Sequence, residues 1–294
     1  MITRRRALQI FAATSLMPSA AQSVDRRYAL GADVAMTLSG AAEVTGPARL
    51  AAWQEIERLE AVFSLYDPRS DLSRLNANGS ISSPRPEMID LLRLCAEIHS
   101  ATDGLFDPTV QPLWQAHANG TSIEAALALV GFDRVTMSDR EIRLGTGQAL
   151  TLNGIAQGYI TDRVTEVLRQ HGLTHALVNI GEYRGLSGPW RLGIEDPVLG
   201  QIGQITLTDR AVATSSPAAM QLADGSTHIV DPTGRIAAPY WSTVAVTAAS
   251  AALADGLSTA LCHAAPITCQ EIVNRFGQPV SVRLIDPQGN LTTL

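Results

Sequence analysis

Apolar side chains recur at intervals of three and four residues in several stretches of the chain, as they do in helices that bury one face. The stretch from Pro47 to Phe63 carries Leu50, Trp53 and Ile56 on this spacing, and Pro47 suits the first turn of a helix. The same periodicity predicts further helices at Pro86–Ser100, Tyr159–Gln170, Ala251–Ala264 and Gln270–Phe276.

Local signals mark the ends of two helices. Thr121 and Glu124 form a capping box, which predicts a short helix that runs to Val130. His171-Gly172 follows the stretch that ends at Gln170, and glycine is common where a helix stops in a left-handed conformation.

Short runs of apolar and β-branched residues between turn residues predict strands. The candidates are Tyr28–Leu38, His175–Ile180, Trp190–Ile194, Gly203–Leu207, Ala211–Thr214, Ser226–Val230, Trp241–Ala249 and Val280–Ile285, with two short pieces between Ile142 and Leu152. The stretches 63–76 and 102–112 are expected to be loops. Because strands and helices mix without regular alternation, internal repeat or linker, the pattern predicts an α+β protein in which residues 22–294 form one unit.

The composition narrows the class of protein. The 294 residues are 46% hydrophobic and 17% charged, which is typical of a soluble globular protein with a substantial core. The net charge of -6 argues against a nucleic-acid binder and against a protein that sits on an anionic membrane. The sequence contains no lysine, so a phosphate group would have to be held by Arg, by a metal ion or by backbone N–H groups.

Residues 1–21 have the features of an export signal. Arg4, Arg5 and Arg6 precede a short apolar run, and Ser19-Ala20-Ala21 resembles a cleavage site. The apolar run is too short to span a bilayer. The arginine cluster favours the twin-arginine route over an ordinary secretory signal, and either route predicts a periplasmic protein. Removal of this segment would leave 19 basic and 28 acidic side chains.

The three cysteines, Cys95, Cys262 and Cys269, do not have the spacing of zinc ligands. Cys95 and Cys262 lie in apolar runs and are expected to be buried. A disulfide between Cys262 and Cys269 stays open at this point, because the periplasm permits one but nothing in the sequence requires it.

A bare corner, Asn153-Gly154-Ile155-Ala156-Gln157-Gly158, lies between a predicted strand piece and the predicted helix that follows it. Two interpretations are open. The glycines provide only the geometry of a tight connection, or they let the main chain approach a ligand closely.

A second candidate site lies in the Ala-rich predicted helix, where Asp255 and Thr259 are four residues apart and therefore share a face. A carboxylate and a hydroxyl one turn apart suit Mg²⁺, although a capping Asp and a Thr bonded to a backbone carbonyl explain the same pair. His228, beside an Asp-Pro-Thr-Gly turn, is either structural or a base near a loop site.

Seven ordered segments together carry a family resemblance. They read FSLYDPRSDLSRLN, GLFDPTV, LTLNGIAQGY, ALVNIGE, AVATSS, HIVDPTG and ADGLSTA. In order and separation they resemble the motifs of the ApbE family of flavin transferases, and they span nearly all of residues 22–294. The resemblance implies an ApbE-like, T-fold-like arrangement of mixed or antiparallel sheets packed with helices.

The resemblance also implies an activity. Such enzymes bind FAD and Mg²⁺, split the FAD diphosphate, release AMP and join FMN to a Thr or Ser hydroxyl of an acceptor flavoprotein. By this resemblance His228 is the acid/base candidate, and the metal ligands are Gly154 (through its carbonyl), Asp255 and Thr259. Flavin or nucleotide contacts fall at Leu30, Tyr66, Leu105, Phe106, Asp107, Thr151, Gln157, Val230 and Ser258.

The chain departs from the family pattern at several cofactor positions. Thr151 stands where the family has Asp, Asn153 and Glu182 where it has Gly, and Gln157 where it has Lys. Leu30 replaces Met, and SSPAAM follows Thr214 where many members have Gly and then Tyr and Arg. None of these departures removes a proposed metal ligand or His228.

The departures resemble those of an exported branch called NosX, which is associated with nitrous oxide reduction and flavinylates the membrane protein NosR. Two alternative functions stay open: a non-catalytic protein that binds or delivers FAD, and an FAD pyrophosphatase that uses water as acceptor.

Overall fold

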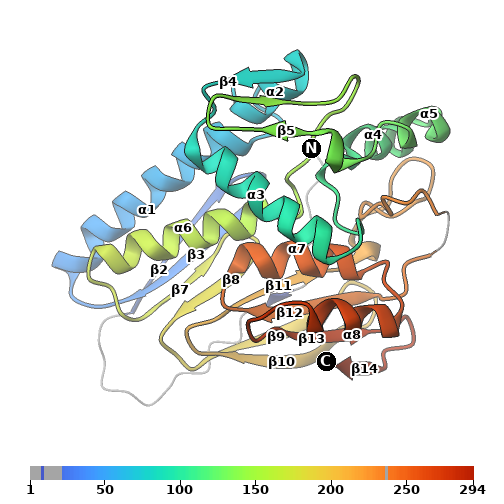
Figure 1. Ribbon diagram of the computed structural model, residues 1–294. Coiled ribbons are helices and arrows are strands. Elements are labelled where there is room, and N and C mark those ends of the chain that lie inside the picture. Colours follow the sequence, from blue (N-terminus) through green and yellow to red (C-terminus); the bar gives the residue numbers. More distant parts are fainter. Residues whose placement is uncertain (1–7, 10–21, 236–237) are drawn as a thin grey trace.

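The computed structural model describes residues 8–9, 22–235 and 238–294 (Figure 1). Its centre is an eight-stranded sheet in which all neighbouring strands are antiparallel. The strand order is β14 (Leu291–Thr293), β13 (Ser281–Ile285), β12 (Thr243–Ala248), β11 (Ala211–Ser215), β8 (Tyr183–Leu186), β7 (Ala176–Asn179), β3 (Ala32–Ser39) and β2 (Gln22–Ala29).

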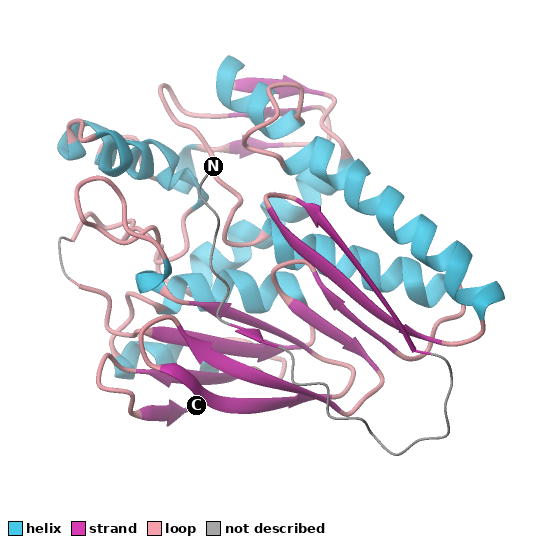
Figure 2. Ribbon diagram, turned by 180° about the vertical axis from the view of Figure 1, so that it is seen from behind, coloured by secondary structure: helices cyan, strands magenta, loops and turns pink. Residues whose placement is uncertain are grey.

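The chain also forms two smaller antiparallel sheets. The first has the order β1 (Leu8–Gln9), β9 (Trp190–Asp196) and β10 (Gly200–Leu207), and the second has β4 (Ser80–Ser82), β6 (Glu141–Arg143) and β5 (Thr136–Met137). The helices gather on one face of the large sheet (Figures 1 and 2). They are α1 (Ala42–Phe63), α2 (Asp71–Asn78), α3 (Pro86–Ala101), α4 (Gln111–Asn119), α5 (Ile123–Leu127), α6 (Ala156–Gln170), α7 (Ala251–Leu261) and α8 (Pro266–Asn274).

The central strands of the large sheet are buried on both faces, which explains why they are apolar at successive positions. In β12, Val244 and Val246 join the core under the helices, whereas Ala245 packs with Leu192 and Ile205 of β9 and β10. Alternate side chains of a strand point to opposite faces, so one strand serves two cores. Within the described residues, no helix combines the length and apolar character needed to cross a bilayer.

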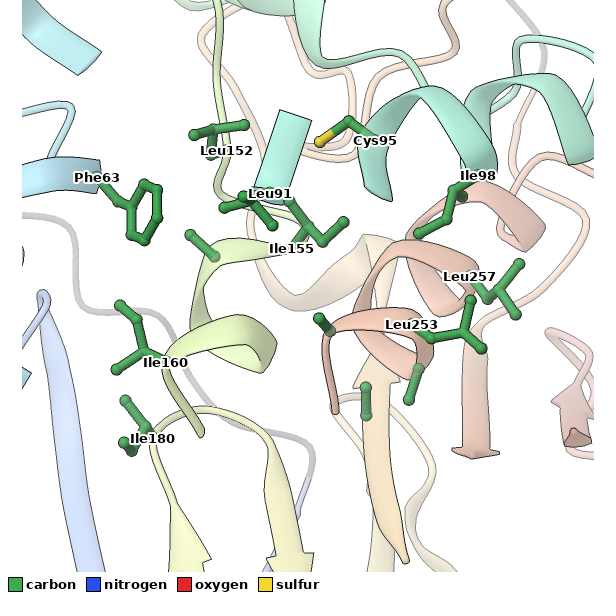
Figure 3. Packing of buried hydrophobic residues seen from close by; sticks show 14 of the residues in the cluster. Phe63, Leu91, Cys95, Ile98, Leu152, Ile155, Ile160, Ile180, Leu253 and Leu257 are labelled. Carbon is green, nitrogen blue, oxygen red and sulfur yellow. The ribbon is translucent and has the colours of Figure 1, made fainter. Parts of the chain in front are cut away.

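The main core holds the helices together at the centre of the molecule. Figure 3 shows Ile98 of α3 beside Leu253 and Leu257 of α7, whereas Ile160 of α6 lies on the other side of that helix, near Ile180. All five side chains are at most 3% exposed. At roughly 25 cal/mol per Å² of buried apolar surface, this packing is the main stabilisation of the helix layer.

The α+β prediction is confirmed, and most predicted elements appear within a few residues of their expected bounds. The helix after the bare corner ends as expected, with Gly172 in a left-handed conformation at φ 83°. The stretches 63–76 and 102–112 were predicted as loops, but they contain most of α2 and the start of α4. Ser70 begins α2 by accepting the N–H of Ser73 on its side chain, at 3.1 Å.

The prediction of one strand at Tyr28–Leu38 is wrong, because this stretch is the hairpin of β2 and β3. Leu30 and Gly31 form its turn with φ of 55° and 70°. The sequence hides this turn, since a two-residue connection interrupts the apolar pattern only briefly.

The predicted strand at Ser226–Val230 is also absent, and the segment forms a loop with one isolated bridge. Side chains take the hydrogen bonds that a strand would use: Asp224 accepts the N–H and the hydroxyl of Ser226, and Thr227 donates to the carbonyl of Ile229. Short polar side chains compete with regular structure in this way.

Two helix starts also differ from the prediction. Helix α1 begins at Ala42, so Pro47 lies beyond the first turn, on an exposed side where water can satisfy the carbonyl that lacks its partner. Ser122, not Thr121, caps α5 by accepting the N–H of Ala125 at 3.3 Å. The backbone N–H of Thr121 instead donates to the carbonyl of Ala116 in the last turn of α4.

Candidate active site

A cleft of about 850 Å³ opens where the bare corner, α7, the end of β11 and two loops meet. Most of the sequence-predicted site residues line it: Tyr66, Leu105, Phe106, Asp107, Thr151, Gly154, Gln157, His228, Val230, Asp255 and Thr259. Leu30 and Ser258 are not among the lining residues. The fold thus brings together segments that lie nearly 200 positions apart in the chain.

The bare corner lies directly against α7. A Cβ atom added to Gly154 would be 2.8 Å from Oγ1 of Thr259, so only glycine lets the corner come this close. The N–H of Gly158, in the first turn of α6, donates to Oδ2 of Asp255 at 3.1 Å. The geometric interpretation of the corner therefore holds, and the same contact places its main chain beside two oxygen-bearing side chains.

The end of β11 supports the other side of α7. Oγ of Ser215 lies 2.8 Å from Oγ of Ser258 and 3.5 Å from Oγ1 of Thr259. Ser258 also donates to the carbonyl of Asp255, so it is buried behind the cleft wall and helps to hold α7.

Thr214, next to Ser215, lines the cleft with a buried hydroxyl oxygen for which the described part of the chain provides no hydrogen-bond partner. An unpaired buried hydroxyl costs roughly 1–3 kcal/mol. A polar ligand in the cleft would remove that cost.

The charged groups of the cleft are acidic. Its lining, as far as the described residues go, includes Asp107, Glu182 and Asp255 but no Arg. Glu182 is 7% exposed and its Oε2 accepts the N–H of Thr214 at 3.2 Å. With no lysine in the chain, a diphosphate in this cleft would need a metal ion or backbone N–H groups to balance its charge.

The available oxygen atoms suit a hard divalent cation. Asp255 offers a carboxylate, Thr259 a hydroxyl and the adjacent corner its main-chain carbonyls, and Mg²⁺ accepts such mixed sets because it keeps several waters. Across residues 8–9, 22–235 and 238–294, no group of three or more His, Cys, Asp or Glu side chains is arranged to hold a metal ion. The oxygen atoms of Asp255, Thr259 and the corner are of the kind that Mg²⁺ prefers.

One apolar pair lines the cleft just before an Asp-Pro-Thr turn. Leu105 and Phe106 precede Asp107, which is 7% exposed. Its Oδ1 accepts the N–H and the hydroxyl of Thr109, and its Oδ2 accepts the N–H of Phe132. The carboxylate of Asp107 is thus engaged in shaping the loop that presents its two apolar neighbours.

His228 enters the cleft from the loop of residues 216–235. Its ring atom Nδ1 lies 3.3 Å from the carbonyl oxygen of Met220, and the backbone N–H of His228 donates to the same oxygen at 3.2 Å. The loop is joined to α4 where Nδ1 of His117 lies 2.6 Å from Oδ2 of Asp224. Hydrogen bonds from the Ser226 and His117 side chains lower the pKa of Asp224 to about 2.

Two sequence-predicted contacts take positions at or beyond the rim. Tyr66 is 78% exposed at the mouth of the cleft. Leu30 lies in the hairpin turn, where its N–H donates to Oε1 of Glu60, and its neighbour Ala32 lines the cleft instead.

All three cysteines are buried, as predicted for Cys95 and Cys262, and none is in a disulfide. The thiol of Cys262 donates to the carbonyl of Ser258, and that of Cys269 to the carbonyl of Ala264. Burial raises the pKa of the Cys269 thiol to about 11.

Thr214 and Glu182 line the cleft but were not predicted from the sequence to be site residues. The substitution of Glu182 for a family glycine was visible in the sequence, but its burial in the cleft was not. The unpaired hydroxyl of Thr214 had no sequence signal at all, since it depends on what surrounds the end of β11.

The model of the ApbE family matches residues 30–283 of this chain. Two relatives are the FAD:protein FMN transferases of Haemophilus influenzae and Escherichia coli, each 27% identical, over 245 and 268 residues. The first alignment covers 71% of both chains, and the second covers 80% of this chain and 76% of the relative.

Two solved structures resemble the fold along nearly its whole length. The ApbE protein of Thermotoga maritima has a TM-score of 0.82 at 26% identity, with 92% of this chain and 96% of that chain covered. Pseudomonas stutzeri flavinyl transferase ApbE has a TM-score of 0.77 at 26% identity, with 93% and 94% covered.

Proposed function

Because the chain belongs to the ApbE family, we propose that it is an FAD:protein FMN transferase, like the relatives it resembles. It transfers FMN from FAD to a Thr or Ser hydroxyl of an acceptor flavoprotein and releases AMP. The observation that carries the proposal is the convergence of Gly154, Asp255 and Thr259 at one wall of a large cleft that also holds His228.

The shape of the cleft supports a dinucleotide substrate. Its volume of about 850 Å³ lies in the range of small-molecule sites, which is roughly 300–1,000 Å³. The apolar side chains of Leu105, Phe106 and Val230 and the exposed ring of Tyr66 suit the flat flavin ring. The oxygen-rich wall formed by the corner and α7 suits the diphosphate with its cation.

The proposed cation is Mg²⁺, held by Asp255, Thr259 and the carbonyl of Gly154. When bound, it neutralises charge on the diphosphate of FAD. The acidic lining supports this requirement, because Glu182 and Asp255 would otherwise repel the substrate.

The chemical step is a phosphoryl transfer. The acceptor hydroxyl oxygen forms a bond to the phosphorus of the FMN half, and the bond between that phosphorus and the bridging oxygen breaks. AMP leaves with the bridging oxygen. His228 takes the proton of the acceptor hydroxyl, a role that typically contributes 10²- to 10⁴-fold to such a rate.

The deciding experiment is the intact mass of an acceptor domain after incubation with this protein, FAD and Mg²⁺, with and without EDTA. We expect a metal-dependent gain equal to FMN. Free FMN and AMP without modified acceptor would favour an FAD pyrophosphatase. Intact, bound FAD would favour a binding or delivery protein, which the substitutions at Thr151, Asn153 and Gln157 make a real alternative.

Two variants test the residue roles. Asp255→Ala should abolish the Mg²⁺-dependent transfer, whereas Asp139→Ala, which alters an exposed carboxylate, should not. His228→Ala should slow transfer far more than it weakens FAD binding, with the exposed His171→Ala as its matched control. If His228→Ala weakens binding but leaves the single-turnover rate intact, His228 is not the base.

The proposed location is the periplasm, with residues 1–21 as a signal for the twin-arginine route. Of that segment, only Leu8 and Gln9 are among the described residues. Replacement of Arg4 and Arg5 by Gln should retain the protein in the cytoplasm, as measured by cell fractionation. The proposed acceptor is a NosR-like membrane flavoprotein, and the same mass assay on its soluble flavin-carrying domain tests this choice against an unrelated acceptor.

A further inference from the structure

Helices α6 and α7 are joined at their amino-terminal ends by two carboxylates, each from the opposite helix. Asp255 of α7 accepts the N–H of Gly158 in the first turn of α6, at 3.1 Å. Asp162 of α6 accepts the N–H groups of Ala251 and Ala252, the first residues of α7, at 2.8 and 3.0 Å. The two carboxylates thus satisfy N–H groups that lack partners within their own helices.

Asp162 makes further contacts that hold it in place at this junction. It accepts the hydroxyl of Ser250 at 2.7 Å, and it is ion-paired with Arg184 of β8. Ser250 in turn caps α7 by accepting the N–H of Leu253. A carboxylate at a helix amino terminus is also stabilised by the helix dipole.

The backbones of the two helices touch at the same place. A Cβ atom added to Gly158 would lie 2.3 Å from the carbonyl oxygen of Ala251, so the helices meet without an intervening side chain. A shift of the start of α7 would therefore move Asp255, one turn along, and Thr259, two turns along.

We propose that Asp162 is a positioning residue for the cation site: it holds the start of α7 so that Asp255 and Thr259 present their oxygen atoms next to Gly154. This inference rests on the proposed function, because it concerns the proposed Mg²⁺ ligands. Asp162 itself is not among the residues that line the cleft. Partners that orient metal ligands typically contribute 10- to 100-fold to metal affinity.

The test is a titration of the full chain with Mn²⁺, in which the EPR signal of the free ion reports binding without any turnover. We expect Asp162→Asn to weaken Mn²⁺ binding about tenfold or more. The matched control is Asp196→Asn, since Asp196 is also a buried carboxylate, with Ser242, Thr243 and two backbone N–H groups as donors. All variants are measured below their unfolding temperatures.

The outcomes separate this inference from the proposed function. Binding by the wild type that is lost in Asp255→Ala supports the cation site. If Asp162→Asn then binds like the wild type, or no worse than Asp196→Asn, the positioning role is wrong while the proposed function stands. If the wild type itself binds no Mn²⁺, both the proposed cation site and the positioning role of Asp162 are wrong.

A milder variant covers the case in which Asp162→Asn does not fold. Ser250→Ala removes one donor to Asp162 and the cap of Leu253 while leaving the carboxylate and Arg184 in place. We expect severalfold weaker Mn²⁺ binding. Unchanged binding would overturn the positioning role.

Discussion

The tripeptide Asp-Pro-Thr occurs twice in the wall of the cleft, at residues 107–109 and 231–233, and both copies fold into the same local corner. In each, Oδ1 of the Asp accepts the N–H of the Thr, at 2.7 Å for Asp107 and 2.9 Å for Asp231. The Thr hydroxyl donates to the same atom, at 2.5 and 2.6 Å. Each corner presents an apolar pair, Leu105-Phe106 or Ile229-Val230, to the cleft.

The two corners differ in what holds them from a distance. Oδ2 of Asp107 accepts the backbone N–H of Phe132, and Oγ1 of Thr109 accepts that of Gly131. The N–H of Thr151, beside the bare corner, donates to the carbonyl of Pro108. The first corner is therefore tied by main-chain hydrogen bonds to two other segments of the site.

The second corner depends on side chains instead. Oδ2 of Asp231 accepts from Nε of Arg235, whose side chain is 50% exposed. A ring nitrogen of His263 lies 4.0 Å from the same oxygen, a contact that the first corner shares, since a ring nitrogen of His99 lies 3.7 Å from Oδ2 of Asp107. The comparison shows that a tripeptide sets the shape of a corner, whereas distant partners set how firmly it is held.

The largest expected difference follows from removing each carboxylate. Asp107→Ala and Asp231→Ala each leave three donors without their acceptor, but the donors to Asp107 are buried, whereas Thr233 and Arg235 are exposed to water. Asp107→Ala should therefore lower the free energy of unfolding by about 3–4 kcal/mol, compared with about 2 kcal/mol for Asp231→Ala. Urea unfolding measures both. Equal losses would contradict the distinction between the two corners.

Removal of the Thr hydroxyls sharpens the same comparison with a smaller perturbation. Thr109→Val loses the bonds to Asp107 and Gly131 and should cost about 1.5–2 kcal/mol. Thr233→Val loses only the bond within its corner and should cost about 1 kcal/mol or less. Urea unfolding checks this prediction: the midpoint should fall further for Thr109→Val than for Thr233→Val, while the dependence of the unfolding free energy on urea concentration stays the same.

The ion pair that holds the second corner can be removed without changing the Asp-Pro-Thr tripeptide itself. Arg235→Gln removes the ion pair with Asp231 and a hydrogen bond to the carbonyl of His263, and it should cost about 1 kcal/mol. It should also shorten the lifetime of bound FAD, because this corner carries Val230. Stopped-flow measurement of FAD release tests this expectation, with the exposed Arg69→Gln as control. If both variants release FAD at the rate of the wild type, the second corner does not determine the lifetime of bound FAD.

The smallest expected effect is a pH dependence at the second corner. Burial lowers the pKa of His263 below its ordinary value, so the folded protein holds this ring neutral. Below about pH 6.5 the unfolded chain binds a proton that the folded chain does not, and the free energy of unfolding falls as the pH drops. His263→Gln should reduce this fall between pH 7.5 and 5.5 by up to about 1 kcal/mol, as measured by urea unfolding at both values.

Local signals in the sequence predicted most of the helices and marked the segments that carry the proposed cation ligands. Asp255 and Thr259 were identified because two oxygen-bearing side chains one turn apart stand out in a helix of Ala and Leu. The hairpin turn at Leu30-Gly31 and the loop at 226–230 were missed, because a brief turn and side-chain hydrogen bonds leave weak traces in an apolar pattern. Asp162 also gave no signal, since its role depends entirely on α7, which starts 89 residues later.

The sequence by itself determined the α+β class, the family resemblance, the absence of lysine and the residue types available for phosphate and metal chemistry. Those properties depend on composition and on spacing within short segments. Only the tertiary structure decided that Gly154 lies against Thr259, that Glu182 and the unpaired hydroxyl of Thr214 are buried in the same cleft, and that one Asp-Pro-Thr corner is held more firmly than the other. These features require close contact between distant segments, and such contacts are set by the packing of the whole core, which no local pattern specifies.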